Sequence, residues 1–492
     1  MKRLVPILSS LILLALTACE KKGQTNYELR GAEVQMAFNL RSTSSSGDPL
    51  YDFCQGGRVA YVTDLGHEDK VLVIPGNKLN TLKGNFKVEA DAKKMWIGSE
   101  NASAGLTKYT VPEVVTKTDP EATDLVQGMS FCSEPVFLSG EAPYEADLIP
   151  LTSAVVFEVM DSRGVWSGTR LSGVTMTASG GKILAGTVVA DLSDASIDEV
   201  QNGSTTLNID CDGDFWVGSS ERSTALGAVL VPTRFTGTIT VSGPLFQEAR
   251  FTVSSPLVFE AGYVKHVQLD LAEAFVTGQP SLPKRLGIFG DSISTFSGII
   301  PSDHRAYYPA GDVDAWTKTY WGLLSSSKYW NCAIDKNTSW SGSSVADGNA
   351  GSVRTPFVDP ARYNLFTNPD VIILFGGTND AITSNGIGLG EFNYDGQLDQ
   401  MVTTKRFRDA YIFLIRKLKQ LHPDVRIICI IGTDIFDEYG NSVEAIAKHY
   451  CLPYVDFRGD SKVTIYSGSH PNANGHAYKA QKIYEQTQHL FQ

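Results

Sequence analysis

The sequence predicts a multidomain protein in which an all-β sandwich region is followed by a C-terminal α/β three-layer domain with a parallel sheet. Its 492 residues exceed what one hydrophobic core holds, and at roughly 150 residues per domain they predict about three domains. The first half alternates apolar and polar residues at the period of a strand. The second half alternates short apolar runs with helical patterns, which is typical of parallel sheets.

The strand-rich region covers residues 27–275, where alternations such as Val34 to Leu40 predict strands with one buried face. Clusters of Gly, Ser, Asn and Asp separate these strands, and no long segment has helical spacing. This stretch is large for one sandwich, and Ser139–Pro143 is a plausible joint. We therefore expect one β-sandwich module at residues 25–145 and a second at residues 146–277.

The α/β domain is predicted at residues 284–492. Two prolines and a glycine in Thr277–Pro283 interrupt both helix and strand, which places a domain boundary there. An apolar stripe along residues 403–421 predicts a helix that packs on the sheet. Five apolar runs predict the strands of that sheet: 285–289, 329–334, 371–375, 425–431 and 454–457.

The N-terminus has the pattern of a secretory signal at residues 1–19. Lys2 and Arg3 precede an apolar stretch that is too short for a comfortable membrane span. The small residues before Cys19 resemble the bacterial lipobox, which implies that Cys19 is lipidated; the alternative is a plain signal peptide with a chance cysteine. We expect an exported protein, lipid-anchored in the bacterial cell envelope at the outer membrane or cell surface, with the lipid as its membrane contact.

Charge and cysteine spacing exclude several function classes. The formal net charge of −12 would repel a phosphate backbone, and no basic run offsets it, so no nucleic-acid partner is expected. The chain has seven cysteines, but the six after Cys19 are widely spaced and form no CxxC pair. Neither a metal site nor a disulfide is predicted.

Two short motifs follow the first two predicted strands of the α/β domain. Ser292 lies in Gly290-Asp291-Ser292, in a turn that aims backbone N–H groups at the space beside its hydroxyl. Gly342 follows the second strand, and a glycine there lets the backbone approach a ligand closely. Each motif alone is weak evidence, since such turns also arise by chance.

Two further motifs supply a neutral donor and a base. Asn379, in Gly377-Thr378-Asn379-Asp380, follows the third predicted strand and offers an amide suited to an oxyanion. His470, in His470-Pro471, precedes the C-terminal helix and could take a serine proton and return it to a leaving group.

These four motifs in this order resemble those of the SGNH (GDSL-like) serine hydrolases, over residues 284–492. The resemblance implies a flavodoxin-like fold and ester hydrolysis through an acyl-enzyme, with Ser292 as nucleophile and His470 as base. It implies an oxyanion hole made by the N–H groups of Ser292 and Gly342 and the amide of Asn379. No metal or other cofactor is implied.

The sequence departs from the family at one position. An aspartate usually stands three residues before the histidine, where this chain has Ser467. Such a carboxylate fixes the imidazole tautomer, and its loss from a serine protease costs up to about 10⁴ in rate. A backbone carbonyl, the Ser467 hydroxyl, Asp456 or Asp460 could orient His470 instead, and the sequence does not choose among them.

The expected substrate is a small acyl ester, and the envelope context favours an acetylated glycan. The alternatives are a lipase or thioesterase, and a surface binding or adhesin-type lipoprotein whose hydrolase domain has degenerated. Residues 25–275 resemble the fimbrillin-like modules of Bacteroidota lipoproteins, through the lipobox before them and the strand opening at Asp147, and this implies a surface or spacer role. Five aromatic residues after the nucleophile could border a sugar cleft or pack in the core: His304, Tyr307, Tyr308, Trp316 and Trp321.

Overall fold

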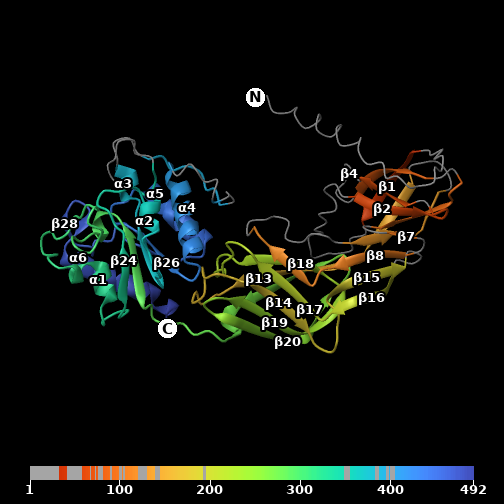
Figure 1. Cartoon of the computed structure of the whole chain (residues 1–492), viewed down its shortest axis with the longest axis horizontal. Coiled ribbons are helices and arrows are strands. Elements are labelled where there is room, and N and C mark those ends of the chain that lie inside the picture. Colours follow the sequence, from red (N-terminus) through yellow and green to blue (C-terminus); the bar gives the residue numbers. More distant parts are fainter. Residues whose placement is uncertain are drawn as a thin grey trace, which may run out of the picture.

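A computed structural model describes most of the chain from residue 33 onward (Figure 1). The described residues are 33–40, 58–66, 68–72, 74–75, 81–88, 91–98, 102–103, 106–119, 130–133, 135–138, 144–191, 196–347, 355–382, 387–394, 398 and 405–491. The predicted signal, Cys19 and the predicted joint at Ser139–Pro143 lie outside them. No helix in the described residues is long and apolar enough to cross a membrane.

The first part of the strand-rich region forms one nine-stranded sheet. Its order is β3-β2-β6-β10-β12-β1-β5-β4, and β11 pairs with β6. The strands are β1 (Glu33–Leu40), β2 (Arg58–Thr63), β3 (Glu68–Leu72), β4 (Ile74–Pro75), β5 (Thr81–Lys87), β6 (Lys94–Gly98), β10 (Phe131–Ser133), β11 (Val136–Phe137) and β12 (Tyr144–Pro150).

The other strands of this region form three further sheets. Two of them are a three-stranded sheet, β18-β13-β21, and a six-stranded sheet, β22-β20-β19-β14-β17-β9. Apolar side chains from both sheets share one buried core, including Phe157 of β13 and Met176 of β14. A four-stranded sheet has the order β16-β15-β8-β7. The strands are β7 (Ala102–Ser103), β8 (Leu106–Val111), β9 (Val114–Lys117), β13 (Ser153–Met160), β14 (Gly173–Ala178), β15 (Ala185–Asp191), β16 (Ser196–Ser204), β17 (Thr206–Cys211), β18 (Thr224–Leu230), β19 (Thr233–Gly243), β20 (Gln247–Phe259), β21 (Val264–Asp270) and β22 (Phe275–Val276).

Strand pairing crosses the predicted module boundary near residue 145. β8 pairs with β15, and β9 pairs in parallel with β17, so residues 106–117 share sheets with residues 185–211. The modules predicted at 25–145 and 146–277 are therefore not separate sheet systems. Alternation along a strand identifies its buried face, but it does not specify the partner strand.

The C-terminal domain contains the predicted parallel sheet, which has five strands in the order β24-β23-β25-β26-β27. Every residue of β25 and β26 is buried, as expected where both faces of a parallel sheet are covered. The second strand begins at Ala333, later than the predicted Tyr329, because Trp330 lies in a turn and packs in the core. The strands are β23 (Arg285–Gly290), β24 (Ala333–Asn337), β25 (Val371–Phe375), β26 (Arg426–Ile431) and β27 (Tyr454–Asp456).

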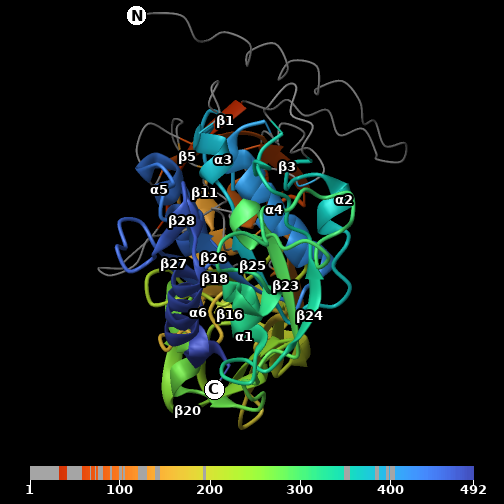
Figure 2. The ribbon, with the colours of Figure 1, turned by 90° about the vertical axis from the view of Figure 1, so that its left-hand side faces the viewer.

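Helices cover both faces of this sheet, which gives three layers that lie side by side in Figure 1; Figure 2 views the domain from the side of α1 and α6. α4 and α5 pack on one face with Leu374 of β25, and α1 and α6 pack on the other face with Ile373. The helices are α1 (Tyr320–Ser325), α2 (Pro360–Tyr363), α3 (Thr378–Ile382), α4 (Phe407–Leu421), α5 (Asp437–His449) and α6 (Ala473–Thr487). A small hairpin, β28 (Ile465–Ser467) and β29 (His470–Pro471), precedes α6.

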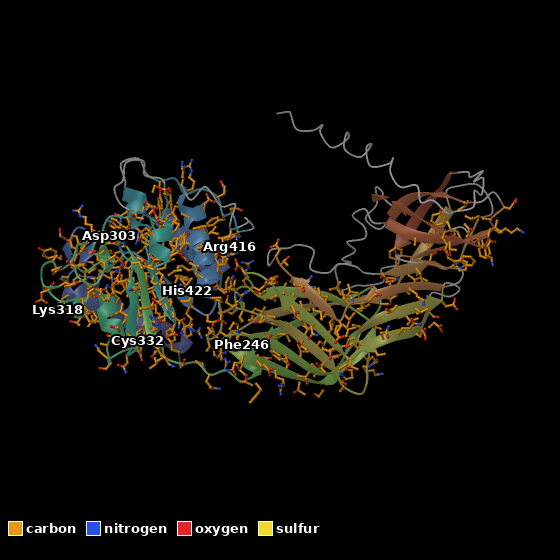
Figure 3. All side chains as sticks on the ribbon, viewed as in Figure 1. Phe246, Asp303, Lys318, Cys332, Arg416 and His422 are labelled. Carbon is orange, nitrogen blue, oxygen red and sulfur yellow. The ribbon has the colours of Figure 1, made fainter. Side chains whose placement is uncertain are left out.

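Buried polar contacts join the α/β domain to the strand-rich region. Lys419 of α4 donates to the carbonyl of Gly168 at 2.8 Å, and Arg426 of β26 donates to that of Val165 at 2.7 Å. Burial lowers the pKa of Lys419 to about 7. Arg416, labelled in Figure 3, lies on the side of the domain that faces the strands and donates to Asp214 at 3.2 Å.

Candidate active site

Ser292 lies at the carboxyl end of β23, in a single 3-10 turn formed by Ser292–Ser294. The Asp291 side chain caps this turn by accepting a hydrogen bond from the Ile293 N–H at 3.1 Å. Asp291 is buried, and burial raises its pKa to about 6. The predicted nucleophile is thus held on a short, capped turn at the edge of the sheet where α/β folds commonly bind ligands.

His470 and Ser292 are in direct contact. The imidazole Nε2 lies 2.8 Å from Ser292 Oγ, although the two residues are far apart in the sequence. If the serine hydroxyl donates to Nε2, the imidazole proton is on Nδ1. This is the arrangement in which a histidine can act as general base toward a serine.

A backbone carbonyl orients the imidazole. His470 Nδ1 lies 3.2 Å from the carbonyl oxygen of Ser467, which can accept the Nδ1–H. Ser467 and His470 are register partners in the β28–β29 hairpin, which brings this carbonyl to the ring. Of the groups named for this role, the structure therefore places the backbone carbonyl of Ser467 on Nδ1.

The two carboxylates considered for the same role have other partners. Asp456 bonds the Arg458 guanidinium, with the shortest distance 2.6 Å. Asp460 accepts from Lys482 and from the Tyr478 hydroxyl, both at 2.9 Å. Neither Asp456 nor Asp460 orients His470 in the described residues, so those two suggestions are wrong. Sequence proximity to the histidine does not indicate which side chains point toward it.

The pH dependence of activity follows from the environment of His470. Burial lowers its pKa below the usual value of about 6.5. The neutral imidazole is the base, so it stays competent to a lower pH than an ordinary histidine would. We expect the acidic limb of a kcat/KM profile to have its midpoint below pH 6.5, and a midpoint well above that value would contradict this environment.

The predicted oxyanion-hole residues lie on one connected set of loops. Gly342 has φ of +78°, a conformation that favours glycine, in the loop that follows β24. Asn379 lies at the start of α3, and its amide nitrogen donates to the carbonyl of Ser343 at 3.0 Å. An amide nitrogen has two N–H groups, so the second can serve an oxyanion.

Asp380 holds the loop that carries Gly342. Its carboxylate accepts from the N–H groups of Val345 at 2.8 Å and Ala346 at 3.0 Å. Asp380 is completely buried, and burial raises its pKa to about 7. The last residue of the Gly377–Asp380 motif therefore anchors the neighbouring loop, a role that the sequence analysis did not assign.

Arg362 is a further supporting residue that sequence reasoning missed. Its guanidinium is fully buried and donates to the carbonyls of Gly290 at 2.9 Å and Thr338 at 3.0 Å, and to Ser343 Oγ at 2.8 Å. It also lies against the rings of Phe289 and Phe357. Arg362 thus ties the strand that leads to Ser292 to the loop of Gly342. Nothing in its local sequence distinguishes it from an ordinary surface arginine.

The aromatic stretch after the nucleophile divides between core and site. Tyr308 and Trp321 are fully buried in the core of the α/β domain. Tyr307 stacks on the His470 ring, and His304 stacks on Trp340 beside the Gly342 loop. In the described residues, no group of three or more His, Cys, Asp or Glu side chains could hold a metal ion.

The domain thus places a serine and a histidine in contact at the carboxyl edge of a parallel sheet. This arrangement is typical of hydrolases that use a serine nucleophile. Residues 284–487 match the family of GDSL-like lipases/acylhydrolases. The C-terminal domain is therefore a GDSL-like lipase/acylhydrolase domain. The resemblance of residues 25–275 to fimbrillin-like modules stays a prediction.

Several solved structures are similar to this chain. A protein assigned as a GDSL-like lipase from Bacteroides uniformis shares 27% identity over 43% of this chain and 97% of its own, with a TM-score of 0.36. One from Bacteroides ovatus shares 25% identity over 42% and 98%, with a TM-score of 0.37. A family two carbohydrate esterase from Clostridium thermocellum, in complex with cellohexaose, shares 14% identity over 78% and 98%, with a TM-score of 0.31. No curated protein matched.

Proposed function

We propose that this chain is a serine ester hydrolase that acts on small acyl esters through an acyl-enzyme. The observation that carries the proposal is the 2.8 Å contact between Ser292 Oγ and His470 Nε2 at the carboxyl edge of the sheet. Together with the Ser467 carbonyl on Nδ1, it supplies a nucleophile, a base and a group that orients the base.

The reaction takes place in two half-reactions. Ser292 Oγ attacks the ester carbonyl carbon while His470 Nε2 takes the hydroxyl proton, and the oxyanion is held by the N–H groups of Ser292 and Gly342 and by Asn379. The tetrahedral intermediate collapses, the C–O bond to the alcohol breaks, and His470 returns the proton to that alcohol. Water then attacks the acyl-enzyme with His470 as base, which releases the acid and restores Ser292.

We propose an acetylated carbohydrate as the substrate and the bacterial envelope as the location. The lipobox-like Cys19 supports a lipid anchor, and a protein anchored in the envelope would have surface glycans within reach. This choice of substrate rests on context and not on a specificity residue.

The test is hydrolysis by the chain lacking residues 1–19, with S292A as the control. Aryl acetate, butyrate and octanoate distinguish a short acyl site from a lipase, and acetate release from acetylated xylan tests the carbohydrate. We expect the highest kcat/KM with acetate and none above background in S292A. Preference for octanoate would support a lipase instead.

The rival function is that of a surface binding protein with a degenerate hydrolase domain. The contact between Ser292 and His470 and the buried supports at Asp380 and Arg362 favour the hydrolase. Equal rates from the wild-type chain and S292A on every ester tested would support the binding protein.

A further inference from the structure

The face of the His470 imidazole is covered by the ring of Tyr307. The two ring centroids are 3.5 Å apart and the rings are within 6° of parallel, which is a full face-to-face stack. The Tyr307 N–H donates to Thr295 Oγ1 at 2.8 Å, and Thr295 Oγ1 donates to the carbonyl of Ser292 at 2.8 Å. The stacked ring is therefore tied through its backbone to the turn that carries the nucleophile.

The neighbouring Tyr308 holds the chain just beyond the histidine. Its hydroxyl donates to the carbonyl of Pro471 at 2.7 Å, and its ring meets the imidazole nearly edge-on at 72°. Tyr308 is fully buried, so this anchor is fixed in the core. Two consecutive tyrosines thus lie beside His470: Tyr307 is stacked on its face, and Tyr308 lies at a steep angle to it.

The two hydrogen bonds of His470 leave the tilt of its ring weakly constrained. Contacts at Nε2 and Nδ1 set the direction of the ring within its plane, but they constrain its tilt weakly. The Nδ1 partner is a neutral carbonyl, and Ser467 is exposed on the hairpin, where water competes for the same hydrogen bond. A carboxylate would attract the Nδ1–H more strongly.

We propose that Tyr307 is a positioning residue for the general base: its ring fixes the plane of the His470 imidazole and shields that face from water. It thereby compensates in part for the carboxylate that Ser467 replaces. This inference rests on the proposed function, because positioning matters only if His470 acts as the base.

Four variants test the proposal: Y307L, Y307F, S467D and the Y307L/S467D double variant. Y307L removes the stacked ring, and we expect kcat on aryl acetate to fall about tenfold with KM nearly unchanged. Y307F keeps the ring and should recover most of that loss. S467D restores the family's aspartate on the residue whose carbonyl contacts Nδ1, and if this carboxylate reaches the imidazole, Y307L should cost about threefold or less in that background.

The pH profile separates positioning from a merely structural role. Loss of the ring exposes the imidazole, so the acidic limb of kcat/KM should move toward higher pH in Y307L and stay in place in Y307F. Asp434, in the loop after β26, raises the pKa of His470, and His470 in turn lowers the pKa of His476, on α6. None of the variants changes either of them. Thermal unfolding and titration with a serine-directed phosphonate correct each rate for the folded, active fraction.

The outcomes distinguish this inference from the proposed function. Equal activity of the wild-type chain and S292A would refute the proposed function itself. With that function established, a Y307L variant that keeps wild-type kcat, or whose acidic limb does not move, would overturn the positioning role. A lower kcat together with a shifted limb, both restored by Y307F, would support it.

Discussion

Replacing Ser292 by alanine is expected to lower kcat by about 10⁴-fold or more, because its hydroxyl is the nucleophile in the proposed acyl-enzyme mechanism. The hydroxyl that would be lost lies 2.8 Å from the base. Replacing His470 by alanine should cost about as much, and the S292A/H470A double variant should lose little beyond either single change, since the two residues act as one unit. The measurement is kcat on aryl acetate.

Ser294 provides a matched control for this prediction. Its hydroxyl lies 2.7 Å from the Tyr320 hydroxyl in the core, two residues beyond the nucleophile. S294A removes a serine hydroxyl from the same turn, and it should cost about 1 kcal/mol of unfolding free energy while leaving most of kcat. If S294A were as damaging as S292A, the loss would come from disruption of the turn and not from loss of the nucleophile.

The parallel sheet and the order of its motifs were predictable because both are local in the sequence. Apolar runs bounded by turn residues predict buried strands, and chemistry placed directly after such a strand lies at the carboxyl edge of the sheet. Ser292 and Asn379 were identified in this way. The start of β24 differs from the predicted one because Trp330 packs in the core but lies in a turn before the strand.

The sequence did not determine which of the candidate groups orients His470. A carbonyl contacts Nδ1 because the β28–β29 hairpin turns through Gly468, at φ of +55°, and returns His470 beside Ser467. Every residue has a backbone carbonyl, so no residue type signals this role. Arg362 was missed for a similar reason, because its carbonyl partners Gly290 and Thr338 come from separate segments.

The strand pairing across the predicted module boundary was not predicted from the sequence for a different physical reason. Pairing of β9 with β17 joins residues almost a hundred positions apart, as the register of Asn208 with Val114 shows. Such a contact depends on the free energy of the whole sheet, because closing a long loop adds an entropic cost that no local pattern records. Composition near residue 145 therefore indicated a joint without indicating which strands pair across it.

Replacing Asn379 by alanine is expected to lower kcat by about 10²- to 10³-fold with little change in KM, the loss found when one oxyanion donor is removed. Its amide already donates to Ser343 at 3.0 Å, which aims the side chain along the loop of Gly342. A donor that meets the oxyanion only as it forms stabilises the transition state and contributes little to substrate binding. The measurement is the separate determination of kcat and KM on aryl acetate.

N379D is the informative companion to that variant. It has nearly the same shape, but it replaces the donor by a carboxylate that repels a developing negative charge, so its kcat should fall at least as far as that of N379A. Thermal unfolding of both variants reports how much the bond to Ser343 contributes to stability. A kcat loss below about tenfold in both would limit Asn379 to holding the loop, and the oxyanion would then depend on the backbone N–H groups of Ser292 and Gly342.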